Sequence, residues 1–325
     1  MSSFNTNTFV YRPLLTQFTV QAGTGMPGPA RQIAPIVTHS KLSGQYGSRD
    51  RDYLGGVDVR RSPGNDVPVR KNTRKQMESF SMIDHCEIVT VPEELVDGDE
   101  AIFEELQSAS LLAVKDIDLA WQKDVHSMTW ATSEAGFQAI YGTNNVIIPA
   151  AKFDAANAPI SSVVRELATR IYKATGHYPN TMGITESLFI VLTSDPENEI
   201  GKTIRYTNGG VITEQILASY FGIQNVFVIK NLEPSANPGQ NEGSPAYDFM
   251  YTGDNIWMAY IDTSKSRFKS TFASTFVSST PNSPFLGVQT RFNRNNKSYE
   301  AEVGAYWDTK IIIPECGGVL FDCLT

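Results

Sequence analysis

The sequence predicts a mixed α+β fold with two interleaved parts, and three observations support this prediction. A long segment rich in proline and glycine comes first, one unusually long helical pattern follows, and helices then alternate with strands before the chain closes in strand-like segments. The 325 residues are 41% apolar, which is enough to bury a sizeable core. We therefore expect one large domain or two intimate ones.

Composition argues against several classes of protein. The formal net charge of −8 does not fit a dedicated nucleic-acid binder with a wide basic face. No apolar run approaches the roughly 20 residues that cross a bilayer, and the first ten residues lack an export signal, so we expect a protein made in a cytoplasm. Cys86, Cys316 and Cys323 form neither an even disulfide set nor a CxxC pair, which predicts free thiols.

The first 75 residues are expected to form an extended arm, because six prolines and many glycines prevent a helix of useful length. Such an arm cannot build its own core, so it must lie on something else or be disordered. Its second half is cationic. Residues 78–91 alternate loosely between apolar and polar and are expected to return as a strand.

One helix of about 28 residues is predicted after Asp99, because apolar residues recur at near-helical spacing from Ile102 to Met128. It would be roughly 40 Å long, well above the usual length in globular proteins. The simplest interpretation of its acidic face is a solvated surface. The alternative is that a neighbour's cationic arm lies across it.

An α/β unit is predicted next. Pro159 and Gly176 mark the ends of a helix, and further elements are expected in this order: a strand at 180–185, a helix at 186–192, a helix at 213–221, a strand at 225–230, an exposed loop at 231–248, and strands at 256–261, 287–292, 299–306 and 310–313.

No catalytic, cofactor or metal site is predicted. The segment from Gly23 to Gly28 matches GxGxxG, but the prolines around it prevent the helix that such a motif must open. The phosphate-binding signature is absent, because Gly201-Lys202-Thr203 lacks its upstream glycine. The four histidines do not pair at helical spacing, and no nucleophile elbow is present.

A set of short motifs occurs in a recognisable order. The first group is Phe153-Asp154, Pro159-Ile160, Thr175-Gly176 and Tyr178-Pro179-Asn180-Thr181. Thr213-Glu214, Phe221-Gly222-Ile223 and Asp254 to Tyr260 follow. Together with the order of arm, loop, long helix and α/β unit, these motifs resemble the tailed-phage major capsid protein family, the Hong Kong 97-type coat. The resemblance runs from about Lys75 to the end of the chain.

The resemblance implies a division of the chain into named parts. Residues 1–63 would be an N-terminal arm, 64–96 an extended loop, 97–153 and 285–325 a peripheral domain with its spine helix at 97–127, and 154–284 an α/β axial domain.

The resemblance also implies a non-enzymatic structural role without cofactors. The chain would self-assemble into hexamers and pentamers of an icosahedral shell around the double-stranded DNA of a tailed bacteriophage, in the cytoplasm of its host. Separate scaffold, portal and decoration proteins would be its further partners, contact with DNA would be non-specific, and no membrane would be involved. An encapsulin-like compartment with enzyme cargo is the alternative, and a soluble α/β enzyme is a more distant one.

Two sets of residues are expected to meet between subunits of such a shell. The cations come from the arm and loop: Arg60, Arg61, Arg70, Lys71, Arg74 and Lys75. The carboxylates come from the spine helix: Glu104, Glu105 and Asp116. Such pairs would set the register of adjacent subunits more than their affinity.

Overall fold

The computed structural model describes most of the chain. The described residues are 10–11, 15, 17, 28–47, 77–95, 99–155, 157–195, 198–208, 212–234, 247–264, 266, 269–280, 283–284 and 286–325. All six predicted contact cations of the arm and loop, Arg60, Arg61, Arg70, Lys71, Arg74 and Lys75, lie outside these residues.

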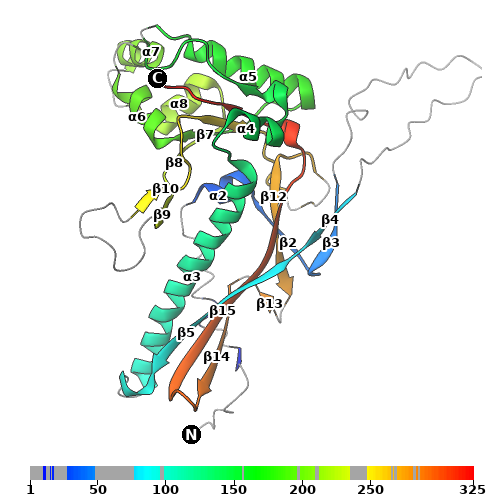
Figure 1. Ribbon diagram of the computed structural model, residues 1–325, viewed down its shortest axis with the longest axis vertical. Coiled ribbons are helices and arrows are strands. Elements are labelled where there is room, and N and C mark those ends of the chain that lie inside the picture. Colours follow the sequence, from blue (N-terminus) through cyan, green and yellow to red (C-terminus); the bar gives the residue numbers. More distant parts are fainter. Residues whose placement is uncertain are drawn as a thin grey trace, which may run out of the picture.

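Helices and strands alternate along the chain (Figure 1). The helices are α2 (Pro29–Ile33), α3 (Asp99–Thr129), α4 (Glu134–Tyr141), α5 (Ile160–Thr175), α6 (Glu186–Ser194), α7 (Glu199–Asn208) and α8 (Glu214–Phe221), with 3-10 turns η2 (Glu93–Leu95), η3 (Thr143–Asn145) and η4 (Pro314–Cys316). The strands are β1 (Val10–Tyr11), β2 (Ile36–His39), β3 (Ser43–Tyr46), β4 (Glu78–Ser81), β5 (Ile83–Pro92), β6 (Val146–Ile147), β7 (Thr181–Thr185), β8 (Asn225–Ile229), β9 (Leu232–Pro234), β10 (Tyr247–Phe249), β11 (Ile256–Ala259), β12 (Ala273–Thr280), β13 (Ser283–Pro284), β14 (Gly287–Asn293), β15 (Ser298–Ile311) and β16 (Gly317–Leu320).

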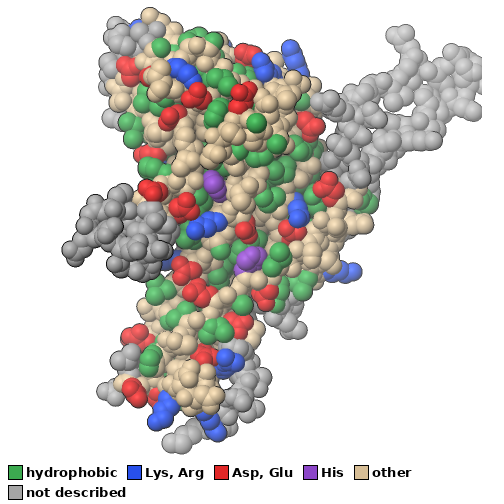
Figure 2. Space-filling model, viewed as in Figure 1, with side chains coloured by type: hydrophobic (Ala, Val, Ile, Leu, Met, Phe, Trp, Pro, Cys, Tyr) green, Lys and Arg blue, Asp and Glu red, His purple; other side chains and the backbone are tan. Residues whose placement is uncertain are grey.

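A seven-stranded sheet is organised around β15, which is 14 residues long. The strand β5 pairs with it along one edge, while β14 and then β12 pair with it along the other. The sequence predicted two separate strands at 299–306 and 310–313, but the structure has one continuous strand, because consecutive partners support its whole length. In Figure 1 this sheet and α3 form the lower part of the molecule, which the space-filling view shows to be narrower than the upper part (Figure 2).

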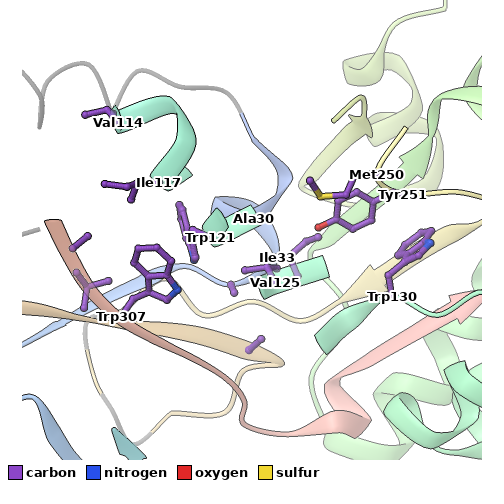
Figure 3. Packing of buried hydrophobic residues seen from close by; sticks show 14 of the residues in the cluster. Ala30, Ile33, Val114, Ile117, Trp121, Val125, Trp130, Met250, Tyr251 and Trp307 are labelled. Atoms are coloured by element: carbon purple, nitrogen blue, oxygen red, sulfur yellow. The ribbon is translucent and has the colours of Figure 1, made fainter. Parts of the chain in front are cut away.

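The long helix α3 lies on this sheet and confirms the helix predicted at 97–127. It spans 31 residues, and its buried stripe includes Ala113, Ile117, Trp121 and Val125. Trp121 on α3 and Trp307 on β15 project into the cluster between helix and sheet (Figure 3). Each indole also donates a hydrogen bond that joins the helix to the sheet. Trp121 Nε1 donates to Thr275 Oγ1 over 3.1 Å, and Trp307 Nε1 donates to Asp124 Oδ2 over 2.8 Å.

A five-stranded sheet in the order β6-β16-β11-β7-β8 forms the centre of the upper part. Alternate residues of β11 enter different cores. Trp257 and Ala259 pack into the cluster that continues down to α3, whereas Ile256 and Met258 pack against α5, α6 and α8 on the other face. Both faces are therefore buried, which explains why all four residues of β11 are apolar.

Two segments join this sheet from outside the range 154–284 expected for the axial domain. The strand β6 pairs parallel with β16, and β16 pairs antiparallel with β11. Residues 146–147 and 317–320 therefore contribute to the five-stranded sheet, although the sequence division assigned both to the peripheral domain. Backbone pairing over more than 60 residues of separation decides this placement.

Part of the predicted arm packs on its own chain. Ala30, Ile33 and Ala34 are almost fully buried in the core beside α3, and β2 pairs parallel with β12. Pro29 begins the single turn of α2, as its fixed φ favours. The expectation that the arm needs an external support therefore does not hold for residues 28–47. The strands β3 and β4 then pair antiparallel at the two ends of segment 48–76.

We predict that Gly318→Ala destabilises the subunit by about 1–3 kcal/mol, the usual effect of overpacking a core. A Cβ on Gly318 would lie 2.7 Å from Leu167 Cδ1 and 2.8 Å from the carbonyl oxygen of Asn145, and a backbone oxygen cannot move aside. Urea unfolding of the purified protein measures the change. Gly304→Ala on β15 is the matched control, because its nearest neighbour would be Cys86 Cβ at an ordinary 3.6 Å. Equal losses in both variants would contradict this account.

Candidate assembly surface

The predicted carboxylates of the spine helix lie on the solvent side of α3. Glu104, Glu105 and Asp116 are all exposed, as is Leu112 with 57% of its surface accessible. Within the described part of the chain, no Lys or Arg lies within ion-pair distance of these three carboxylates. Their charges therefore remain open to a cation from elsewhere.

Glu87 joins this acidic surface from the neighbouring strand β5, and the sequence analysis did not identify it. Partial burial and the negative charge of Asp116 raise the pKa of Glu87. Two like charges that lie together in this way destabilise the isolated subunit slightly, and a cation bound between them would remove that cost. We call Glu87, Glu104, Glu105 and Asp116 the acidic seam.

Two other charged residues of α3 are already engaged within the chain. Lys123 Nζ lies 3.6 Å from Glu233 Oε2. Asp124 accepts the hydrogen bond from Trp307 and lies 3.8 Å from His85 Nε2. The polar face predicted from the sequence therefore divides into a part that fixes α3 to its own subunit and a part that remains open.

One cation of the N-terminal segment also meets α3 within the chain. Arg31 Nη2 lies 3.9 Å from Asp118 Oδ1, and the guanidinium lies over the ring of Trp121. Burial lowers the pKa of Arg31, and burial likewise raises the pKa of Asp118, although Gln122 and Arg31 oppose that rise. Arg31 and Asp118 thus form an ion pair between an arm cation and a helix carboxylate. The pair lies within one chain, and neither residue was among those predicted to meet between subunits.

A polar cluster at the start of α5 has residue types found in catalytic sites, but its geometry is that of a helix cap. Glu199 Oε2 accepts from the Ser161 amide over 3.0 Å, and Glu199 Oε1 accepts from the Ser161 hydroxyl and, over 3.1 Å, from Tyr220. Burial alone would raise the pKa of Glu199, but these hydrogen bonds together hold it below its usual value. The carboxylate satisfies an amide at the N-terminus of α5 and ties α7 to α8.

The histidines make packing contacts. His85 stacks on Trp307 with ring centroids 3.6 Å apart, His177 stacks on Tyr260, and His126 meets the edge of Tyr251. Burial lowers the pKa of His126. Among the described residues, no group of three or more His, Cys, Asp or Glu side chains is placed to hold a metal ion.

The cysteines are free thiols, as predicted. Cys86 is exposed, whereas Cys316 and Cys323 are buried, and burial raises the pKa of Cys316 to about 12.

None of the described helices is both long and apolar enough to cross a membrane.

Comparison with solved structures identifies the fold. A phage-related protein from Bordetella bronchiseptica superposes with a TM-score of 0.72 at 14% sequence identity, and the match covers 98% of each chain. The chain has the fold of the tailed-phage coat proteins. A Microbacterium phage Oxtober96 protein matches with a TM-score of 0.52 at 10% identity, over 99% of this chain and 96% of that one. A protein described as a virus-like particle from Pyrococcus furiosus matches with a TM-score of 0.51 at 10% identity, over 94% and 97%.

Comparisons of sequence with family models and with curated proteins do not detect this fold. No family model matches the sequence, and no curated protein matches it. At 10–14% identity, the shared property is the arrangement of the elements rather than any set of side chains. Lys and Arg side chains are scattered over the face seen in Figure 2 rather than gathered in one patch, in keeping with the acidic composition.

We predict that Glu199→Gln lowers the free energy of unfolding by about 1 kcal/mol at pH 7, because hydrogen bonds to the charged carboxylate are lost. The pKa of Glu199 is lower in the folded state than its usual value of 4.5. Its contribution is therefore complete above about pH 4.5 and disappears as the pH falls through the folded-state pKa. Urea unfolding from pH 7 to pH 3 measures this. Glu166→Gln, which removes only the exposed pair with Arg170, is the control, and a difference between wild type and Glu199→Gln that does not shrink in acid would refute the assignment.

Proposed function

We propose that this chain is the major capsid protein of a tailed bacteriophage, and that it assembles through hexamers and pentamers into an icosahedral shell around double-stranded DNA. The observation that carries the proposal is the full-length likeness to the phage-related protein, with a TM-score of 0.72 over 98% of each chain. The exposed carboxylates Glu104, Glu105 and Asp116 of α3 are compatible with it, since their charges are available to a neighbouring subunit.

The charge distribution suggests how neighbouring subunits recognise each other. The arm and loop between β3 and β4 in the sequence contain six cations: Arg60, Arg61, Arg70, Lys71, Arg74 and Lys75. In the proposed shell these cations meet the acidic seam of the adjacent subunit. Charged contacts of this kind guide the encounter and fix the register, whereas apolar contacts supply most of the affinity. The conformational entropy lost when such a loop is fixed is recovered only in the assembled shell.

The named parts of the coat follow from the same proposal. Residues 1–63 are the N-terminal arm, 64–96 the extended loop, 97–153 and 285–325 the peripheral domain, and 154–284 the axial domain, to which β6 and β16 add their strands. The spine helix is α3.

Contact with the packaged DNA is weak and independent of sequence in this proposal. An acidic coat can enclose DNA when only a few basic residues face inward. Assembly takes place in the host cytoplasm, and separate scaffold, portal and decoration proteins complete the particle. The protein performs no catalysis and needs no cofactor.

Expression of the chain alone, followed by size exclusion and negative-stain microscopy, tests the proposal. Closed particles or capsomer rings are expected. Particles that hold a cargo protein and no DNA when isolated from their native host would instead indicate an encapsulin-like compartment. A chain that remains monomeric at high concentration, both alone and with the scaffold protein of its native host, would contradict the proposal and favour a soluble enzyme.

We predict that the triple variant Arg70→Glu, Lys71→Glu and Arg74→Glu forms no shells at concentrations at which the wild type assembles, because three attractive contacts per interface become repulsive. Soluble folded subunits should remain, since the change replaces charged side chains with other charged side chains and removes no apolar residue. Electron microscopy and sedimentation measure the outcome.

The complementary variant identifies the partner surface. Adding Glu104→Lys, Glu105→Lys and Asp116→Lys to the triple variant should restore shells at least in part, since each contact is again between opposite charges. Lys123→Glu is the control on the same helix, because Lys123 pairs within its own subunit. Shells of normal yield from the loop variant alone, or no rescue by the helix variant, would refute the pairing.

A further inference from the structure

A small two-stranded sheet on one flank of the molecule is fastened to α3 at its base (Figure 1). The strands β9 and β10 pair antiparallel, with Asp248 directly opposite Glu233. Directly opposed residues share a face of a sheet, and Glu233 Oε2 lies 3.6 Å from Lys123 Nζ on α3. The face that carries both carboxylates is therefore turned toward α3. The other face presents three exposed apolar side chains, Leu232, Tyr247 and Phe249.

Three residues along one side of α3 hold the base of this sheet. Lys123 makes the ion pair just described. His126 meets Tyr251 edge to face, with ring centroids 4.7 Å apart. Trp130, whose amide still donates to the His126 carbonyl, donates from Nε1 to the carbonyl oxygen of Thr252 over 3.0 Å. Because spacings of three and four residues share one face of a helix, His126 is the middle one of three attachments.

The middle attachment contains two buried polar atoms that lack hydrogen bonds. Within the described part of the chain, neither His126 Nε2 nor the Tyr251 hydroxyl has a partner. The Tyr251 ring is buried beside Met250 and Trp130 (Figure 3), and burial raises its pKa, so the hydroxyl keeps its proton. A buried polar atom without a hydrogen bond costs free energy that water recovers when the contact opens. This attachment therefore favours opening, unlike the paired groups on either side of it.

Two carboxylates and one ammonium lie around the His126 ring. Glu233 and Asp248 lie on the face of the small sheet that is turned toward α3, and Lys123 precedes His126 by one turn. Asp124 is engaged elsewhere, since it accepts a hydrogen bond from β15. Burial lowers the pKa of His126 more than the charge of Glu233 raises it. The neutral ring is therefore the form that fits the docked sheet.

We propose that His126 is a pH-sensitive latch between α3 and the β9–β10 sheet, closed when the ring is neutral and released when a proton from solvent binds to it. The imidazolium carries a donor at Nε2, where no described residue accepts a hydrogen bond, so the sheet moves away and water surrounds the ring. The docked form is favoured above the ordinary pKa of 6.5 and loses that advantage as the pH falls below it, because the open form then binds the proton more tightly. The latch acts within one chain and does not depend on assembly into a shell.

Hydrogen exchange of the purified protein at pH 7.5 and pH 5.5, measured by mass spectrometry, tests the latch. This range lies above the ordinary titration of aspartate and glutamate. After correction for the intrinsic effect of pH on exchange, opening of residues 231–234 and 247–252 should rise several-fold in acid. The upper limit is about tenfold, set by a pKa of 6.5 in the open form.

Two variants assign the effect to one ring. His126→Gln cannot take up the proton, so the small sheet should open to the same extent at both pH values. His177→Gln is the matched control, because His177 also stacks on a tyrosine, Tyr260, and it should keep the wild-type response. A rise in His126→Gln equal to that of the wild type would overturn the latch, as would exchange of the small sheet that does not change with pH.

A titration of the histidine rings by NMR gives a second measurement that needs no change at His126 itself. The chain has four histidines, so replacing the other three with glutamine assigns the His126 signal. Its pKa should lie below 6.5. A pKa at or above that value would mean that the docked sheet accepts the charged ring, and would overturn the latch while leaving the proposed capsid function standing.

Discussion

The contact between α3 and the strand β15 is the constraint on which the rest of the structure depends. Trp121 and Trp307 fill the space between helix and sheet, and each indole also donates a hydrogen bond across the seam. The packed rings and the two hydrogen bonds together fix the position and rotation of α3 relative to the sheet. Because β15 is also the strand to which β5, β12 and β14 pair, one contact orients both the helix and the sheet, and therefore every side chain that they present outward.

This orientation sorts the charges of the subunit into two groups. Arg31, Lys123 and Asp124 meet partners inside the chain. The partly buried pair of Arg31 with Asp118 is less screened by solvent than the exposed pair of Lys123 with Glu233. The acidic seam has no such partners among the described residues. The shell function proposed above would use both groups, since internal pairs hold the shape of the chain and open charges are available to guide a neighbouring copy.

Several elements were predictable because they depend on residues close in sequence. The apolar repeat of α3, the boundaries Pro159 and Gly176 of α5, and the strands β7 and β8 belong to this class. The helix α4 and the strand β12 were not predicted. The first is short, and the second contains Ser274, Thr275 and Ser278, which are buried yet have the composition of a loop. Pairing with β2 and β15 satisfies the backbone of β12 and makes it a strand.

The sequence by itself determined the order of the parts, the existence of the long helix and the sign of the charge on each segment, because periodicity, capping and composition are local properties. Only the tertiary structure decided which faces meet. It placed Glu87 beside Asp116, joined β6 and β16 to the five-stranded sheet, folded residues 28–47 onto their own core, and turned the apolar side of β9 and β10 outward. Each of these depends on strand pairing between residues far apart in the chain, and that pairing is set by packing of the whole molecule rather than by any local preference.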